Sequence, residues 1–210
     1  MSIINLLSSQ VGDRSEYSNR KVVLQCLEEP TLLDEIVEGL QSHDAALVGD
    51  CAEVLTQVAE THPERVAPYA KDLAGLLTHR KTRVRWEAIH ALSLIAPLAP
   101  KVIGALLPQL GELIRADASV IVRDYAVDAI ANYAPTSPKN ARAAYPYLKE
   151  ALTTWEGKQA GHALKGLANV ATTVPKLAPE LNELGQHYLT HRRGVVRQAA
   201  KALVQATEKK

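Results

Sequence analysis

The sequence contains no phenylalanine, and aromatic residues of all kinds make up only 4% of its 210 positions. A core built from large rings is therefore excluded, and the core volume must come from Leu, Val, Ile and Ala. Apolar residues still account for 47% of the chain, which suffices for one domain with a sizeable interior. Small side chains suit helices that pack closely, at interaxial distances of about 8–10 Å.

Cysteine and long apolar runs are also scarce. The two cysteines, Cys26 and Cys51, both lie among apolar residues with helical spacing, so we interpret them as reduced core residues and expect a cytoplasmic protein. No run approaches the roughly 20 apolar residues that span a bilayer, so no membrane association is expected. Residues 1–7 lack the basic start of a signal peptide.

The chain has almost no excess of charge of either sign. It carries 24 Lys and Arg residues against 23 Asp and Glu residues, for a formal net charge of +1. No overall field therefore draws the protein to nucleic acid or to a membrane surface.

What the chain does contain is a segment that recurs. Residues 84–95 read VRWEAIHALSLI, residues 122–133 read VRDYAVDAIANY, and residues 196–204 read VRQAAKALV. Their common skeleton is V-R-x-x-A-x-x-A-L-x-x-I, whose apolar positions fall on one face of a helix with 3.6 residues per turn.

Two degenerate copies, at residues 47–55 and 159–167, complete a series with an even period. The last apolar residue of the skeleton steps along the chain by 37, 38, 37 and 37 residues, through Leu55, Leu92, Ile130, Leu167 and Val204. Such a period is the sequence signature of a repeat array.

Each repeat is predicted to contain two helices. The first helix begins near a proline, and we expect first helices over residues 64–78, 101–115, 139–154 and 176–190. The second helix carries the skeleton, and we expect second helices over residues 82–96, 119–134, 157–172 and 193–207. The turns between them are short, which makes each pair antiparallel.

Prolines and polar caps add detail to this prediction. A proline recurs inside the first helices, where it removes a hydrogen bond and bends the helix; these residues are Pro68, Pro108, Pro146 and Pro179. Before the repeats we expect a short capping helix over residues 2–9 and a helix with Asn19 as its N-cap, and we expect Pro30 to open the first helix of the first repeat.

With these features the chain resembles the HEAT-repeat family. The family unit has a proline that bends its first helix, an Asp near the turn and an Arg early in its second helix, and Pro108, Asp117 and Arg123 match all three. The resemblance implies an all-α, right-handed α-α superhelix of about five to six antiparallel helix pairs. We expect one domain over residues 1–210, with cap helices at 1–29 and repeats at about 30–60, 63–97, 100–134, 138–172 and 175–207.

The resemblance also implies that the second helices line a concave groove. Three skeleton positions point away from the apolar stripe, and the side chains there form one predicted patch: Trp86, Glu87, His90, Asp124, Tyr125, Asp128, His162 and Lys165. Aromatic rings with adjacent charges are typical of binding hot spots. The leading hypothesis is a non-enzymatic scaffold that binds a protein partner there, against the alternative of a solvated helix face.

A second hypothesis is nucleic-acid or phosphate binding along the edge formed by the turns. The candidate anion-binding residues are Arg80, Lys81, Arg83, Arg192 and Arg193. Against it stand the near-zero net charge and two acidic residues of the predicted groove, Asp124 and Asp128, which would repel DNA.

A third hypothesis is an enzyme of the HEAT type, similar to the bilin lyases. The sequence shows no catalytic constellation, no phosphate-binding glycine loop and no His-Glu dipeptide of the kind that deoxyhypusine hydroxylases use to hold iron. We therefore expect no catalytic residues, no metal and no cofactor. The charged end at residues 208–210 suits a solvated last helix, so a monomer is expected.

Overall fold

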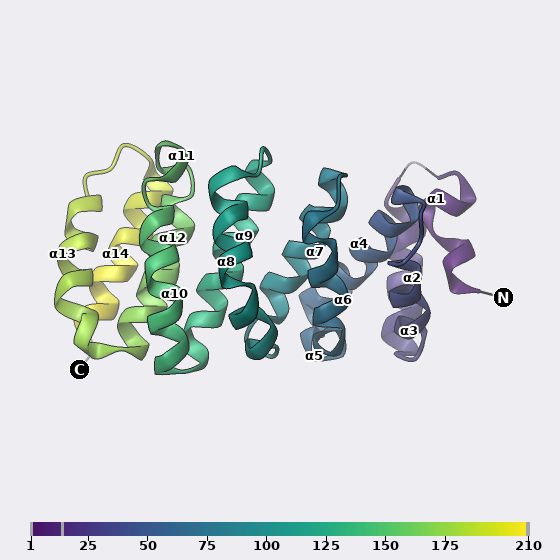
Figure 1. The fold of residues 1–210 in the computed structure, drawn as a ribbon, viewed down its shortest axis with the longest axis horizontal. Coiled ribbons are helices and arrows are strands. Elements are labelled where there is room, and N and C mark those ends of the chain that lie inside the picture. Colours follow the sequence, from purple (N-terminus) through teal and green to yellow (C-terminus); the bar gives the residue numbers. More distant parts are fainter. Residues whose placement is uncertain (1, 14, 209–210) are drawn as a thin grey trace. The chain divides into compact units, whose positions relative to one another are not determined.

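The computed structural model describes residues 2–13 and 15–208, which form helices joined by short turns (Figure 1). No β-strand occurs in those two ranges, as the sequence predicts. No helix in them is both long enough and apolar enough to cross a bilayer. The chain divides into two compact units, Met1–Ala99 and Pro100–Lys210, and each is described by itself.

The first unit begins with four short elements around one long helix. These are η1 (Ile3–Leu6), α1 (Ser8–Val11), α2 (Tyr17–Glu28), α3 (Leu32–Gly39) and the long helix α4 (Ala45–Thr61). Helices α1, α2 and α3 all pack against α4, which is the first of the second helices. Asp44 caps α4, because its carboxylate accepts a hydrogen bond from the Ala46 amide at 2.9 Å.

The prediction of Asn19 as an N-cap is wrong. Helix α2 begins two residues earlier, and Asn19 is 1% exposed inside it. Its side chain accepts a hydrogen bond from the Ser8 amide at 2.9 Å and donates to Glu53 at 3.0 Å. An N-cap asparagine uses its side-chain oxygen to accept a hydrogen bond from a main-chain amide in the first turn of its own helix. Here it bonds to other elements instead.

The remaining helix pair of the first unit has a broken first helix. It runs as α5 (Pro63–Val66), η2 (Ala67–Tyr69), α6 (Ala70–Gly75) and η3 (Leu76–Thr78), followed by the second helix α7 (Thr82–Ile95). Pro68 lies in η2, where the α-helical hydrogen bonding is interrupted. A proline has no amide hydrogen to donate, so this break is the expected consequence. Helix α7 packs against α4.

The second unit contains three helix pairs. In chain order its elements are α8 (Pro100–Ala116), α9 (Val120–Tyr133), η4 (Ala134–Thr136), α10 (Pro138–Ala151), α11 (Thr154–Gly157), α12 (Ala160–Thr173), η5 (Pro175–Leu177), α13 (Ala178–Tyr188) and α14 (Gly194–Glu208). Helix α12 packs against both α9 and α14, so each second helix is buried against its sequence neighbours. This is the packing expected of stacked repeats.

The prolines of this unit follow the prediction in two of three cases. Pro108 and Pro146 lie inside α8 and α10. Pro179 does not bend its helix, because η5 ends before it and Pro179 stands in the first turn of α13. That turn needs no amide donor from residue 179, so proline is tolerated there.

The skeleton residues form the core as predicted. Val84, Ala88, Ala91, Leu92 and Ile95 of α7 are each at most 1% exposed. Ala is frequent among the equivalent residues of α9 and α12, which allows close approach of the helices.

The two cysteines, Cys26 and Cys51, are buried and free. Burial raises the pKa of their thiols, to about 11 for Cys26 and about 12 for Cys51. Both thiols are therefore uncharged at neutral pH, as expected of core residues.

One hydrogen-bonding pattern recurs at the turn before a second helix. A side chain accepts the amide hydrogen two residues ahead, at 3.1 Å for Ser42, 3.1 Å for His79, 2.8 Å for Asp117 and 3.2 Å for His191. This local bond fixes the turn in the way an Asx-turn does. Histidine therefore does in two repeats what Asp117 does in another.

The skeleton arginine completes this turn. Arg85, Arg123 and Arg197 each donate to the main-chain carbonyl oxygen six residues earlier, which belongs to His79, Asp117 and His191 respectively. The arginine of the V-R pair thus ties the start of the second helix to the turn that precedes it.

Candidate binding surface

All eight residues of the predicted patch lie on second helices. Trp86, Glu87 and His90 are on α7 of the first unit. The other five are on α9 and α12 of the second unit: Asp124, Tyr125, Asp128, His162 and Lys165. The patch is therefore described in two halves, and the convergence of both halves on one surface stays a prediction.

Two residues of the first half, Trp86 and Glu87, line a pocket of about 360 Å³, and His90 is not part of its lining. Helices α4 and α7 supply one side of it, through Asp50, Glu53, Trp86 and Glu87. Six N-terminal residues also line it: Ser8, Ser9, Asp13, Ser15, Glu16 and Asn19. The pocket lies where the cap helices α1 and α2 pack against α4, close to the start of α7.

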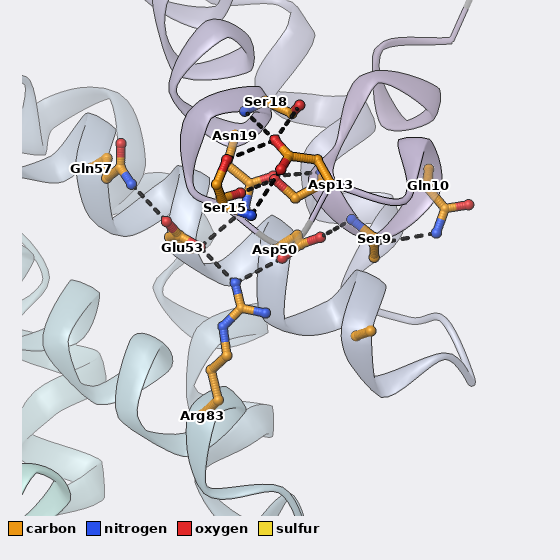
Figure 2. Close-up of polar contacts among 12 residues, drawn as sticks. Ser9, Gln10, Asp13, Ser15, Ser18, Asn19, Asp50, Glu53, Gln57 and Arg83 are labelled. Carbon is orange, nitrogen blue, oxygen red and sulfur yellow. Dashed lines mark hydrogen bonds and ion pairs between the residues drawn. The ribbon is translucent and has the colours of Figure 1, made fainter.

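Arg83 forms ion pairs with two acidic side chains that line this pocket (Figure 2). Its Nη2 lies 2.7 Å from Oδ1 of Asp50 and 2.6 Å from Oε2 of Glu53. The Asp50 carboxylate also accepts from the Ser9 amide at 2.7 Å. Burial alone would raise the pKa of Asp50, but the hydrogen bonds from Ser9 and Arg83 outweigh it and lower that pKa. Asp50 is therefore an ionised carboxylate inside the wall.

Glu87 is a buried carboxyl group of the pocket that Arg83 does not contact. It is 7% exposed, and among the described residues no Lys, Arg or His side chain lies within ion-pair distance of it. Burial raises the pKa of Glu87 to about 7, with a further contribution from the charge of Glu53. Its charge therefore changes near neutral pH.

The second half of the patch contains a histidine–carboxylate pair. Nδ1 of His162 on α12 lies 2.7 Å from Oδ1 of Asp128 on α9. The hydrogen bond that His162 donates to the Asp128 carboxylate raises the pKa of His162 against the opposing effect of burial. Asp124, one turn before Asp128, accepts from the buried amide of Gln159 at 3.0 Å. Lys165 is exposed. The pair is partly exposed, with both side chains about one third accessible, so it can offer hydrogen-bonding groups to a polar ligand.

Of the five candidate anion-binding residues, three have exposed side chains and two form contacts within the protein. Arg80, Lys81 and Arg192 are exposed. Arg83 is held by Asp50 and Glu53, so its charge is compensated. Nη1 of Arg193 donates to the carbonyl oxygens of Gly157 and Lys158. The charge available to a phosphate along this edge is therefore smaller than the sequence indicates.

Sequence reasoning missed several residues of the pocket. Asp50 and Glu53 occupy the same skeleton positions as Glu87 and His90, so the repeat alignment could have found them. Ser9, Asp13 and Asn19 belong to no repeat, and nothing in the sequence indicates that the cap folds over α4 and α7. No group of three or more His, Cys, Asp or Glu residues able to hold a metal occurs within residues 2–13 and 15–208.

Comparison with known proteins identifies the fold. No protein-family profile and no curated protein matches the chain. Among solved structures, a designed armadillo repeat protein in complex with the peptide (KR)4 matches with a TM-score of 0.75 at 22% identity, over 98% of each chain.

Two engineered proteins solved by a structural genomics consortium match as well. One has a TM-score of 0.76 at 24% identity, over 98% of this chain and 97% of its own. The other has a TM-score of 0.74 at 21% identity, over 98% and 94%. Likeness at this level shows the fold, so the prediction of an all-α solenoid built of helix pairs is confirmed. The assignment to HEAT in particular stays a prediction.

Proposed function

We propose that the chain is a non-enzymatic scaffold of the HEAT type, which binds an extended segment of another protein along the exposed polar faces of its second helices. The observation that carries this proposal is the pocket between α4, α7 and the N-terminal cap. It brings charged side chains of two successive second helices, together with Trp86, to one concave site. Concave pockets with a few fixed polar groups are the usual places where proteins hold ligands.

The solved structures support the same choice. The designed armadillo repeat protein that matches this chain along its length is in complex with a peptide. A solenoid fold by itself carries no activity, so the function must come from the side chains on it. Here these side chains offer charge, an aromatic ring and hydrogen-bonding groups, which is the composition of a recognition surface.

Selection from an unbiased library of displayed 12-residue peptides tests this proposal. We expect the wild-type protein to enrich a family of related peptides. The variant Trp86→Ala with Asp128→Lys should bind those peptides at least 10-fold more weakly, since it alters both halves of the patch. The control variant Lys101→Ala with Lys139→Ala changes exposed residues of the first helices and should bind them normally. No enrichment, or equal binding by both variants, would contradict the proposal.

The alternative hypothesis, phosphate or nucleic-acid binding along the edge formed by the turns, is tested in a separate assay. It requires retention on heparin at low salt that falls steeply as salt rises. The compensated charge of Arg83 and the engaged side chain of Arg193 argue against it.

A further inference from the structure

The pocket of the first unit has an excess of negative charge. Among the described side chains that line it, five are carboxylic acids, namely Asp13, Glu16, Asp50, Glu53 and Glu87, and one is a guanidinium, that of Arg83. Glu16 is also paired with Arg20 outside the lining. Arg83 contacts only Asp50 and Glu53 among the five acids. Asp13 is held instead by hydrogen bonds from Ser15 and Ser18 (Figure 2). The lining therefore favours a positively charged group.

Glu87 is a buried acidic side chain of this pocket that has no cation as a partner in the described part of the chain. The side chain is more than nine-tenths buried and lines the cavity, yet no cation is paired with it within the described residues. A hydrogen bond from the Thr56 hydroxyl lowers the pKa of the Glu87 carboxyl group. The hydroxyl has only one hydrogen, however, and two main-chain oxygens compete for it at 3.0 Å, those of Ala52 and Glu87. A buried carboxylate without a full partner is costly. A cation from outside would satisfy it.

Trp86 supplies the second element of such a site. It precedes Glu87 on α7 and also lines the cavity. A guanidinium group combines two properties that fit this lining, because it can donate in a fork to carboxylates and can stack on an aromatic face. A volume of about 360 Å³ lies within the range of small-ligand pockets, about 300–1,000 Å³.

We propose that this pocket binds the side chain of an arginine in the partner segment, with Glu87 accepting its hydrogen bonds and Trp86 contacting its plane. The inference rests on the proposed function as a peptide-binding scaffold, and it names the residue type that the first unit recognises. It makes the cap elements part of the binding site, since they close the pocket opposite α4 and α7.

The test uses the full chain and a small probe, N-acetyl-arginine-N-methylamide, so that it does not depend on a selected peptide. The chain has two tryptophans, so its NMR spectrum contains two indole signals, one from Trp86 and one from Trp155 in the other unit. At pH 8, where Glu87 is ionised, we expect the Trp86 signal to shift saturably with the probe and the Trp155 signal to stay unchanged. The uncharged isostere N-acetyl-citrulline-N-methylamide should bind at least 5-fold more weakly.

Two charge-matched variants decide the role of Glu87. Glu87→Gln should weaken binding of the arginine probe at least 5-fold. Glu38→Gln removes the same charge from an exposed residue of α3 and should bind it as the wild type does. The charged groups that act on Glu87 are Glu53 of α4, Arg83 of α7 and Glu16 beside α2, and all three remain in both variants.

The outcomes separate this inference from the proposed function. Equal responses of both indole signals, equal binding of the citrulline probe, or equal binding by the two variants would overturn the arginine pocket. If library peptides bind the second helices without arginine, the pocket inference fails and the function stands. If the probe binds as expected but no peptide is enriched, the function fails while the pocket keeps its specificity for guanidinium.

Discussion

Nη1 of Arg85 donates to the main-chain carbonyl oxygen of His79, 2.8 Å away, and Nδ1 of the same histidine accepts from the Lys81 amide at 3.1 Å. The same two bonds join Arg197, His191 and Arg193 near the other end of the chain. The turn before a second helix is thus closed by one side-chain acceptor and one arginine.

This relationship predicts how the turn histidines can be replaced. His191→Asp keeps an acceptor for the Arg193 amide, as Asp117 does in its own repeat, so its free energy of unfolding should stay within about 0.5 kcal/mol of the wild type. His191→Ala loses the bond and should cost about 1 kcal/mol. Urea denaturation checks both, with exposed His43→Ala as a control that should change nothing. Equal stability of the Asp and Ala variants would contradict the role of the turn bond.

Arg83 should be important for stability because the two carboxylates it contacts are buried. The side chains of Asp50 and Glu53 are 2% and 9% exposed, whereas that of Arg83 is 45% exposed. Arg83→Met leaves both acids without their cation and should cost about 2 kcal/mol, less than a fully buried pair because Arg83 reaches solvent.

The pH dependence of that loss follows from the lowered pKa of Asp50. A carboxyl group whose pKa is lowered in the folded state stabilises the protein at pH values above its ordinary pKa of 3.8. This contribution is lost as the pH falls through the folded pKa. The difference between wild type and Arg83→Met should therefore shrink at pH 3. Adding Asp50→Asn should recover part of the loss at pH 7. A constant difference across this range would show that Arg83 acts through packing alone.

Glu87 should make the protein less stable as the pH rises. Its folded pKa is about 7, above the ordinary 4.5, because burial disfavours the charged form. The folded state therefore holds this proton more tightly than the unfolded state, and the resulting stability is lost between pH 4.5 and 7. Glu87→Gln removes the effect, so its advantage over the wild type should grow by about 1–3 kcal/mol from pH 5 to pH 8. Urea denaturation at both values measures it, and a pH-independent difference would contradict the assignment.

His162 should titrate above the ordinary value of 6.5 for histidine. The hydrogen bond to the Asp128 carboxylate raises its pKa, so the stability from this pair is fully present below pH 6.5 and is lost as the pH rises through the folded pKa. NMR titration of the imidazole protons should show a lower pKa for His162 in Asp128→Asn and a smaller decrease in Asp124→Asn. The same pKa in wild type and Asp128→Asn would mean that the pair does not form in solution.

The turn between α10 and α12 should contain strain that glycine relieves. Trp155 and Glu156 have left-handed backbones with φ of 51° and 57°, followed by Gly157 at 70°. Such a backbone costs a residue with a Cβ about 1–2 kcal/mol. Glu156→Gly should therefore stabilise the protein by about 0.5–1 kcal/mol after the flexibility it adds to the unfolded chain. Lys201→Gly, in the regular helix α14, should instead destabilise it by about 1 kcal/mol.

Most of the fold could be predicted because the repeat period fixes which residues face inward. The skeleton positions Val84 and Leu92, with their copies in the other repeats, identified the second helices and the core. Short turns then fixed the pairing. Pro179 shows the limit of this reasoning, because the local sequence does not distinguish a proline inside a helix from a proline that starts one. In the structure η5 ends at Leu177, so Pro179 lies in the first turn of a new helix, α13.

The candidate site could be predicted only where it follows the repeat. Trp86 and Glu87 were found from their skeleton positions, and Asp50 could have been. Asn19 was misplaced because its partners, Ser8 and Glu53, lie on other elements, and such long-range contacts leave no periodic trace in the sequence. Trp155 falls between the predicted helices at 139–154 and 157–172, so the sequence places it in a turn. Its ring lies over the buried guanidinium of Arg123, 4.0 Å from ring centre to Cζ.

The central claim is that a partner segment lies on the second helices, and photo-crosslinking measures it most directly. A photoreactive amino acid is placed at exposed positions 165 and 198 on the second helices α12 and α14, and at exposed positions 101 and 139 on the first helices α8 and α10. The account predicts that a library-selected peptide crosslinks to positions 165 and 198 and not to positions 101 and 139. Crosslinks that come mainly from the first helices would contradict it.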